Sequence, residues 1–139
     1  MSTETTRLAV ETLFQSEMAA HLPEVTILYQ NADSNAPQGL HVSLWLMEGR
    51  AHEANIGNRT VDRHVGVVQV TVAMPVRTGT SKGNQIADFV GLIFRNKQIR
   101  LEDGALLRFR IPSNSYQGDV GGYAHVTVRI PYWRDEVAR

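Results

Sequence analysis

The chain has no cysteine among its 139 residues, which excludes disulfides, thiolate metal sites and cysteine nucleophiles. It also has no net charge, because 14 basic residues balance 14 acidic ones, so no global field attracts it to nucleic acid or to a membrane surface. No apolar run approaches the roughly 20 residues that a membrane-spanning helix needs. Polar and acidic residues interrupt the N-terminus early, so we expect no secretory signal and a protein that acts where it is made.

Motifs of catalysis are missing as well. The five histidines show neither HxH nor HExxH spacing, whereas a zinc site needs three or four convergent ligands. The nucleophile-elbow pattern GxSxG is absent, and the carboxylates occur mostly singly rather than as acid–base pairs. The sequence therefore predicts no catalytic, cofactor-binding or metal-ligating residue, and an enzyme is the less favoured class.

The segment RTGTSKGN has some features of a phosphate-binding loop, because glycines, a lysine and hydroxyl groups precede a predicted helix. Lys82 comes before Gly83, however, so the GxxxxGK[ST] spacing fails. We interpret Thr80 or Ser81 instead as the cap of the helix that follows.

The clearest signal in the chain is a strand, a turn and a helix between Val65 and Asn96. Apolar side chains alternate from Gly66 to Met74, as in a half-buried strand, and apolar residues then recur at helical spacing. The inward set of the strand is Val68, Val70, Val72 and Met74, and the helical stripe is Ile86, Phe89, Val90, Ile93 and Phe94. This unit predicts a helix packed on a sheet.

The remaining pattern completes one α+β domain over residues 1–139, a mostly antiparallel or mixed sheet with two helices on one face. An amphipathic helix is expected from Glu4 to about His21, followed by strands at 25–30 and 40–47. The apolar face of the helix is Val10, Leu13, Phe14 and Met18, and the inward set of the second strand is Leu40, Val42, Leu44 and Leu46. The segment 48–64 is polar and ambiguous, and 53–58 within it fits either a strand or an extended arm. Two strands near the C-terminus flank a flexible loop at 113–122. The inward residues are Leu107, Phe109 and Ile111 on the first strand and Val126, Val128, Ile130 and Tyr132 on the second.

The outward faces of the last two strands carry positive charge. Arg108 and Arg110 lie on the polar face of one strand, and Arg129 lies on that of the other. Trp45 is expected on the same side of the sheet. Two interpretations stay open: a solvated sheet face, or a contact surface for another subunit or a polyanion, since arginine and aromatic residues are enriched at interfaces.

The order of these elements resembles that of the tail-terminator, or tail-completion, proteins of long-tailed bacteriophages. The likeness extends over roughly Thr6 to Trp133. It lies in the strand HVSLWLMEG after an N-terminal helix, in HVGVVQVTVAMP running into GTSKGNQIADFVGLIFRN, and in the closing strands with their aromatic end at 130–133. The loop VRTGTSKGN is longer than the glycine-rich turn that family members often have.

The resemblance implies a structural virion protein. Such proteins form a ring, usually hexameric, on the head-proximal end of the tail tube, where the ring ends tube polymerisation and offers a surface for head–tail joining. The implied partners are further copies of the chain, the tail tube protein and the head–tail connector, with DNA passing through the lumen without sequence-specific binding. No cofactor and no membrane are implied. The implied location is the virion, with the host cytoplasm during assembly.

A ring needs one patch to meet a different patch on the neighbouring subunit. We expect the exposed sheet face and the polar arms 48–64 and 113–122 to provide such patches, with the arms loose in the monomer and ordered on assembly. The predicted subunit or partner interface comprises Trp45, Arg50, His52, Arg59, Arg63, Arg108, Arg110, Tyr116 and Arg129.

Two other classes remain as alternatives. One is another neck or tail component, either a head–tail connector or a tube subunit; a tube subunit needs a long hairpin, and the pattern at 48–64 is too broken to decide. The other is a small nucleic-acid-binding protein or an enzyme. The basic run for nucleic-acid binding is Arg95, Lys97, Arg100, Arg108 and Arg110. It lacks the interleaved aromatic residues of a stacking platform in sequence.

Overall fold

A computed structural model of the chain describes residues 2–29, 39–53, 61–75, 81–120 and 122–137. The two helices are α1 (Ser2–His21) and α2 (Ser81–Phe94). The strands are β1 (Thr26–Tyr29), β2 (His41–Glu53), β3 (Val61–Pro75), β4 (Gln98–Arg100), β5 (Leu106–Phe109), β6 (Ser113–Val120) and β7 (Tyr123–Val137).

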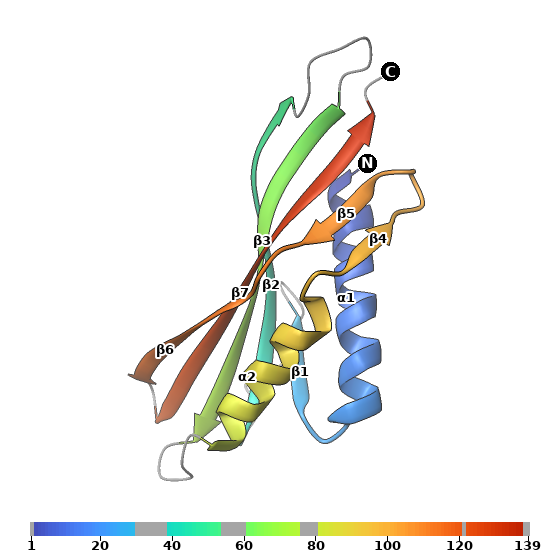
Figure 1. Ribbon diagram of the computed structural model, residues 1–139. Helices are drawn as coiled ribbons and strands as arrows, with labels where there is room; N and C mark the ends of the chain where they lie inside the picture. The colour runs from blue at the N-terminus through green and yellow to red at the C-terminus, as the bar shows by residue number, and fades with distance from the viewer. Residues whose placement is uncertain (1, 30–38, 54–60, 76–80, 121, 138–139) are drawn as a thin grey trace.

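All seven strands belong to one twisted mixed sheet in the order β1-β2-β3-β7-β5-β4. β5 and β6 both pair with the edge of β7 that faces away from β3. β5 pairs with residues 132–135 of β7, and β6 pairs with residues 123–129. Only β1 and β2 pair in parallel; the other pairs are antiparallel. The three long strands β2, β3 and β7 run the length of the molecule, and both helices lie on one side of them (Figure 1). The predicted fold class is confirmed.

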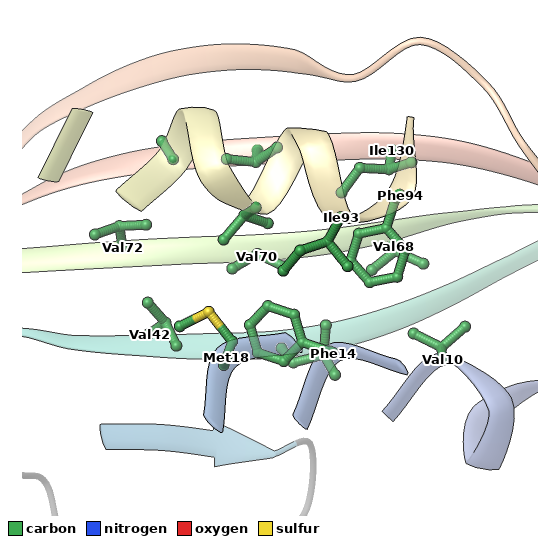
Figure 2. Close-up of a cluster of buried hydrophobic side chains, with 14 of the residues drawn as sticks. Val10, Phe14, Met18, Val42, Val68, Val70, Val72, Ile93, Phe94 and Ile130 are labelled. Atoms are coloured by element: carbon green, nitrogen blue, oxygen red, sulfur yellow. The ribbon is translucent and has the colours of Figure 1, made fainter. Parts of the chain in front are cut away.

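The core lies between this face of the sheet and the two helices. Figure 2 shows Phe14 of α1 and Phe94 of α2 among the valines of the long strands. The rings of Phe14 and Phe94 are stacked with centroids 6.2 Å apart, Phe94 contacts Phe109 at 5.0 Å, and Phe109 contacts Tyr132 at 6.3 Å. One chain of aromatic contacts therefore links α1, α2, β5 and β7.

The predicted inward residues are buried or partly buried against this core, with one exception. The fully confirmed buried set is Val10, Phe14, Met18, Val42, Leu44, Val68, Val70, Val72, Met74, Ile86, Val90, Ile93, Phe94, Leu107, Phe109, Val126, Val128, Ile130 and Tyr132. The partly buried members are Leu13, Leu40, Leu46 and Phe89. The exception is Ile111, which is 65% exposed.

Ile111 is exposed because β5 and β6 are not in register with one another. Phe109 pairs with Tyr132 and Ser113 pairs with Arg129, so the connecting segment holds one residue more than the opposing stretch of β7. An extra residue shifts the alternation of side chains. The prediction that Ile111 continues the inward set of Leu107 and Phe109 is therefore wrong.

The prediction of a loop at 113–122 is wrong for residues 113–120, whereas looseness of this segment before assembly stays a prediction. Residues 113–120 form β6, which pairs with β7 from Ser113 to Val120. Backbone pairing needs no apolar side chains, so the polar composition of 113–120 concealed a strand. The register shifts between Tyr116 and Gly118, and Gly118 has a φ of +78°, a combination typical of a glycine bulge.

The ambiguous segment 48–64 forms much of a long hairpin. β2 continues to Glu53, β3 begins at Val61, and the two strands pair as far as Glu53 and Asp62, with a register shift between Glu48 and Ala51. Residues 54–60 lie outside the described residues. The sequence did not predict β4, a strand of three residues that pairs with β5.

The boundaries of α2 follow local signals. Asn96 just beyond its end has a φ of +57°, the left-handed conformation that commonly terminates helices. The helix begins at Ser81. Since Thr80 lies outside the described residues, the identity of the cap stays a prediction.

Tyr132 lies flat over Gly66, its partner on β3. A Cβ atom on Gly66 would lie 2.5 Å from the phenol of Tyr132 and 2.7 Å from the main-chain oxygen of Met47. The absence of a side chain at 66 thus lets the phenol cross β3 toward Glu48. Burial raises the pKa of Tyr132, and the charge of Glu48 raises it further.

We expect Gly66→Ala to lower the free energy of unfolding by about 1–3 kcal/mol, the usual cost of overpacking. Urea denaturation measures the change. Gly91→Ala is the matched control, because a Cβ there meets Pro112 at an ordinary 3.5 Å and alanine stabilises a helix interior by about 0.5–1 kcal/mol relative to glycine. Equal stability of wild type and Gly66→Ala would contradict the close packing.

The raised pKa of Tyr132 predicts a loss of stability in alkali. The stability that neutral Tyr132 contributes to the folded chain is fully present below about pH 10, the ordinary tyrosine pKa in the unfolded chain. Above that pH the unfolded chain releases a proton that folded Tyr132 retains, so the free energy of unfolding falls by up to about 1.4 kcal/mol per pH unit. Urea midpoints measured between about pH 9 and 11 should fall less steeply for Tyr132→Phe than for wild type. Tyr116→Phe, which removes a hydroxyl from a ring that is 59% exposed, is the control for the loss of a phenol as such.

Candidate assembly interface

The sheet face opposite the helices, here called the outer face, carries an exposed apolar patch. Because even-numbered residues of β3 and β7 enter the core, odd-numbered residues lie on the outer face. Trp45, Gln69 and Arg129 form one row across β2, β3 and β7, and Met47, Val67 and Pro131 form the next row. Trp45 is 44% exposed and Met47 is 40% exposed. We call Trp45, Met47, Val67, Pro131 and Arg129 the outer patch; its mixture of aromatic, methionine and arginine side chains is typical of protein interfaces.

Beside the outer patch, Trp133 stands between two arginines that come from either side of β7. The guanidinium carbon of Arg63, on β3, lies 3.7 Å from the centroid of the Trp133 ring, and that of Arg110, after β5, lies 4.7 Å from it. Arg63 also donates two hydrogen bonds to Asp135, from Nε to Oδ1 at 2.8 Å and from Nη2 to Oδ2 at 2.9 Å. The hydrogen bond to Asp135 is the main cause of a raised pKa at Arg63. This arrangement fixes the tryptophan ring on the outer face.

A hollow of about 290 Å³ adjoins Trp133 on the side of β4 and β5. We call it the basic pocket, because three of its lining residues are cationic. It is lined by Asn96, Lys97, Gln98, Arg108, Phe109, Arg110, Ile111 and Trp133. Ile111 and Trp133 also line it, so the hollow combines apolar side chains with positive charge.

The helix side of the molecule has a second depression, of about 480 Å³, between the first half of α1 and the segment around β4. We call it the α1–β4 groove. Its lining is mainly apolar, and Leu8 is 51% exposed there. Glu4, Arg100 and Glu102 also line it.

A network of charged side chains surrounds one buried cation, Arg134. Arg134 is only 1% exposed and lies 3.1 Å from Glu136 and 3.5 Å from Asp103. His64 contacts the same Glu136 carboxylate at 3.1 Å. Arg134 Nη2 lies within ion-pair distance of Glu136, yet it lacks hydrogen-bond geometry to any described acceptor. Because both carboxylates are close, the charge of Arg134 is compensated within the chain.

The structure places five of the predicted interface residues together on the outer face: Trp45, Arg63, Arg108, Arg110 and Arg129. Tyr116 is elsewhere, on β6 at the position paired with core-facing Val126. Arg50 and His52 lie in β2, where the main chain of His52 pairs with Arg63, but their side chains lie outside the described set, as does Arg59 altogether. A role of these residues in an interface stays a prediction.

Sequence reasoning missed Trp133 as the centre of this surface. The signal was present, since Trp133 follows inward Tyr132 and therefore points outward. What the sequence does not show is that Arg63 and Arg110, 47 positions apart, both reach its ring. Arg63 is also less available than predicted, because Asp135 neutralises it.

Within the described ranges, no group of three histidine, aspartate or glutamate side chains is placed to hold a metal ion. No helix in that part of the chain is both long and apolar enough to cross a membrane.

A family model of phage tail terminator proteins matches residues 6–132. This chain belongs to the phage tail terminator family. It is therefore a structural protein of the phage tail and a component of the virion. The family resemblance inferred from the sequence is confirmed.

Comparison with solved structures supports the same fold. A protein without a functional name is 23% identical, with a TM-score of 0.77 over 100% of this chain and 99% of that one. A chain from the virion of a native gene transfer agent particle is 14% identical, with a TM-score of 0.59 over 88% of this chain and 92% of that one. Among curated protein sequences, none matches this chain.

We expect the Arg63–Asp135 pair to stabilise this terminator's outer face. A double-mutant cycle with Arg63→Gln and Asp135→Asn should give a coupling energy of about 1 kcal/mol, because the pair is bidentate and only partly exposed. Urea denaturation of the four proteins measures it. The cycle for Arg7 and Glu11, on the surface of α1, should give a smaller coupling. No coupling between Arg63 and Asp135 would contradict a stabilising role.

Proposed function

We propose that this chain forms a homo-oligomeric ring, a hexamer, that caps the head-proximal end of the phage tail tube. The ring ends tube polymerisation and provides the surface for head–tail joining. Its partners are further copies of the chain, the tube protein and the head–tail connector, and DNA passes through the lumen without sequence-specific binding. The observation that carries the proposal is the family match over residues 6–132. The role is structural rather than enzymatic.

The geometry supports a ring because the chain has two unlike surfaces on opposite sides. A closed ring needs a heterologous contact, in which one patch meets a different patch on the neighbour. The outer patch faces away from the helices, whereas the α1–β4 groove lies on the helix side. We place the outer patch in the contact between subunits, since Trp45 and Met47 are exposed large apolar side chains.

One observation favours a second candidate, a tail tube subunit. Such a subunit needs a long hairpin, and β2 and β3 pair as far as Glu53 and Asp62. A tube subunit polymerises into long tubes on its own, whereas a terminator stops at a ring and shortens tubes of another protein. The two roles are therefore separable in solution.

The decisive experiment mixes the purified chain with purified tail tube protein. Light scattering of the chain alone should give the mass of a ring, and electron micrographs of the mixture should show shorter tubes with one capped end. Long tubes formed by the chain alone would favour the tube subunit. A chain that stays monomeric both alone and with tube protein would contradict both roles.

Trp45→Ala should weaken ring formation without unfolding the chain. Truncation of a central interface aromatic costs about 2 kcal/mol or more, which corresponds to a roughly 30-fold higher dissociation constant. Light scattering over a dilution series measures the change. Leu92→Ala is the matched control, because Leu92 is 65% exposed but lies on α2. Equal effects of the two substitutions would place the contact elsewhere.

A further inference from the structure

The basic pocket holds positive charges that the described chain does not compensate. Lys97, Arg108 and Arg110 all line it, and no acidic residue does. Among the described residues, none of the three takes part in an ion pair, whereas Arg7, Arg63 and Arg134 all do. Three cations around one small hollow repel one another. An anion that entered the pocket would relieve this repulsion.

The neighbouring arginine shows what kind of anion fits. Arg63 and Arg110 both reach the ring of Trp133. Arg63 donates two hydrogen bonds to the carboxylate of Asp135, which neutralises its charge. Arg110 has no carboxylate partner in the described chain. A guanidinium is a planar fork that matches a carboxylate. A carboxylate at Arg110 would therefore repeat, on the other side of β7, the arrangement already present at Arg63.

The surroundings strengthen such an interaction. Trp133 is half-buried and Ile111 lines the same hollow, so part of the lining is apolar. Charge-assisted hydrogen bonds are stronger where water is partly excluded. The amide side chains of Asn96 and Gln98 line the same hollow and offer further donors.

The pocket fits a carboxylate better than a nucleic acid. Its cations surround one hollow of about 290 Å³, whereas binding to single strands uses a groove that follows several phosphates. The outer face beside it also carries the acidic Asp135. Trp133 does supply the aromatic residue that the basic run lacks in sequence, but Arg63 and Arg110 already contact its ring.

The chain itself offers few carboxylates for this purpose, which favours a different partner over a second copy. Most of the described carboxylates already take part in ion pairs: Glu4 and Glu11 with Arg7, Glu17 with His21, Glu24 with Lys82, Asp135 with Arg63, and Asp103 and Glu136 with Arg134. Asp62, Asp88 and Glu102 stand outside these pairs, and of these three Asp88 and Glu102 are exposed; Asp88 accepts a hydrogen bond from Asn114.

We propose that the basic pocket binds the carboxylate side chains of an acidic segment in a partner protein, with Arg110 and Arg108 as the main ligands. The site lies within one chain, so this inference does not rest on ring formation. A chain that forms no ring but binds an acidic peptide through Arg110 would overturn the proposed function and leave the pocket assignment standing.

The test uses the fluorescence of Trp133. The chain has two tryptophans, so Trp45→Phe leaves Trp133 as the only one. Titration of this variant with acetylated hexaglutamate should change the emission in a saturable way. Arg110→Gln should weaken binding by at least about tenfold and Arg108→Gln by several-fold. Arg95→Gln is the matched control, an exposed arginine outside both the pocket and the outer patch, and it should change binding less than twofold or so.

Three results would overturn the proposal. The first is no saturable change with the peptide, or an equal loss in Arg95→Gln. The second is tighter binding of a thymidine oligonucleotide of the same net charge, again dependent on Arg110, which would make the site a nucleic-acid contact. The third is self-association that Arg110→Gln abolishes and the peptide does not affect. If Arg110→Gln fails to fold by circular dichroism, Lys97→Gln and Arg110→Lys replace it; both should weaken peptide binding.

Discussion

The register between β3 and β7 is the constraint on which the rest of this structure depends. Residues 61–75 of β3 pair with residues 123–137 of β7 without a register shift. This pairing places Val68, Val70 and Val72 in the core and leaves Arg129 and Trp133 on the outer face. A slip by one residue would exchange the two faces. It would bury Arg129 and Trp133 in place of Val128 and Tyr132. The apolar residues of the core and the polar residues of the outer face therefore both favour the observed register.

The helices and long strands were predictable because their apolar side chains are periodic. Helical spacing around Phe14 and Phe94 and alternation around Val70 predict which side of each element is buried. These residues are buried in the structure. Two kinds of feature were not predictable. β6 is held by backbone hydrogen bonds to β7, so its polar side chains gave no strand signal. Ile111 fits the alternation of its neighbours, but the extra residue between β5 and β6 turns it to solvent.

The candidate interface was predictable in part for a similar reason. Strand alternation alone puts Trp45, Arg108, Arg110 and Arg129 on the outer face. The combination of Arg63, Trp133, Asp135 and Arg110 depends on which strands are neighbours, and a single sequence does not state strand order. The described parts of the polar arms 48–64 and 113–122 are extensions of the sheet.

The position of β7 has a consequence for how the chain folds. β7 is the last strand in sequence, yet it lies in the middle of the sheet between β3 and the β5–β6 edge. The β2–β3 hairpin can form from local contacts, whereas the pairing of β3 with β7 joins distant parts of the chain and is slower to form. During synthesis, the edge of β3 therefore stays unpaired, and the part of α2 that packs on β7 stays uncovered, until residues 123–137 have left the ribosome. Truncation near the C-terminus would remove the centre of the sheet, whereas loss of β1 would remove only an edge.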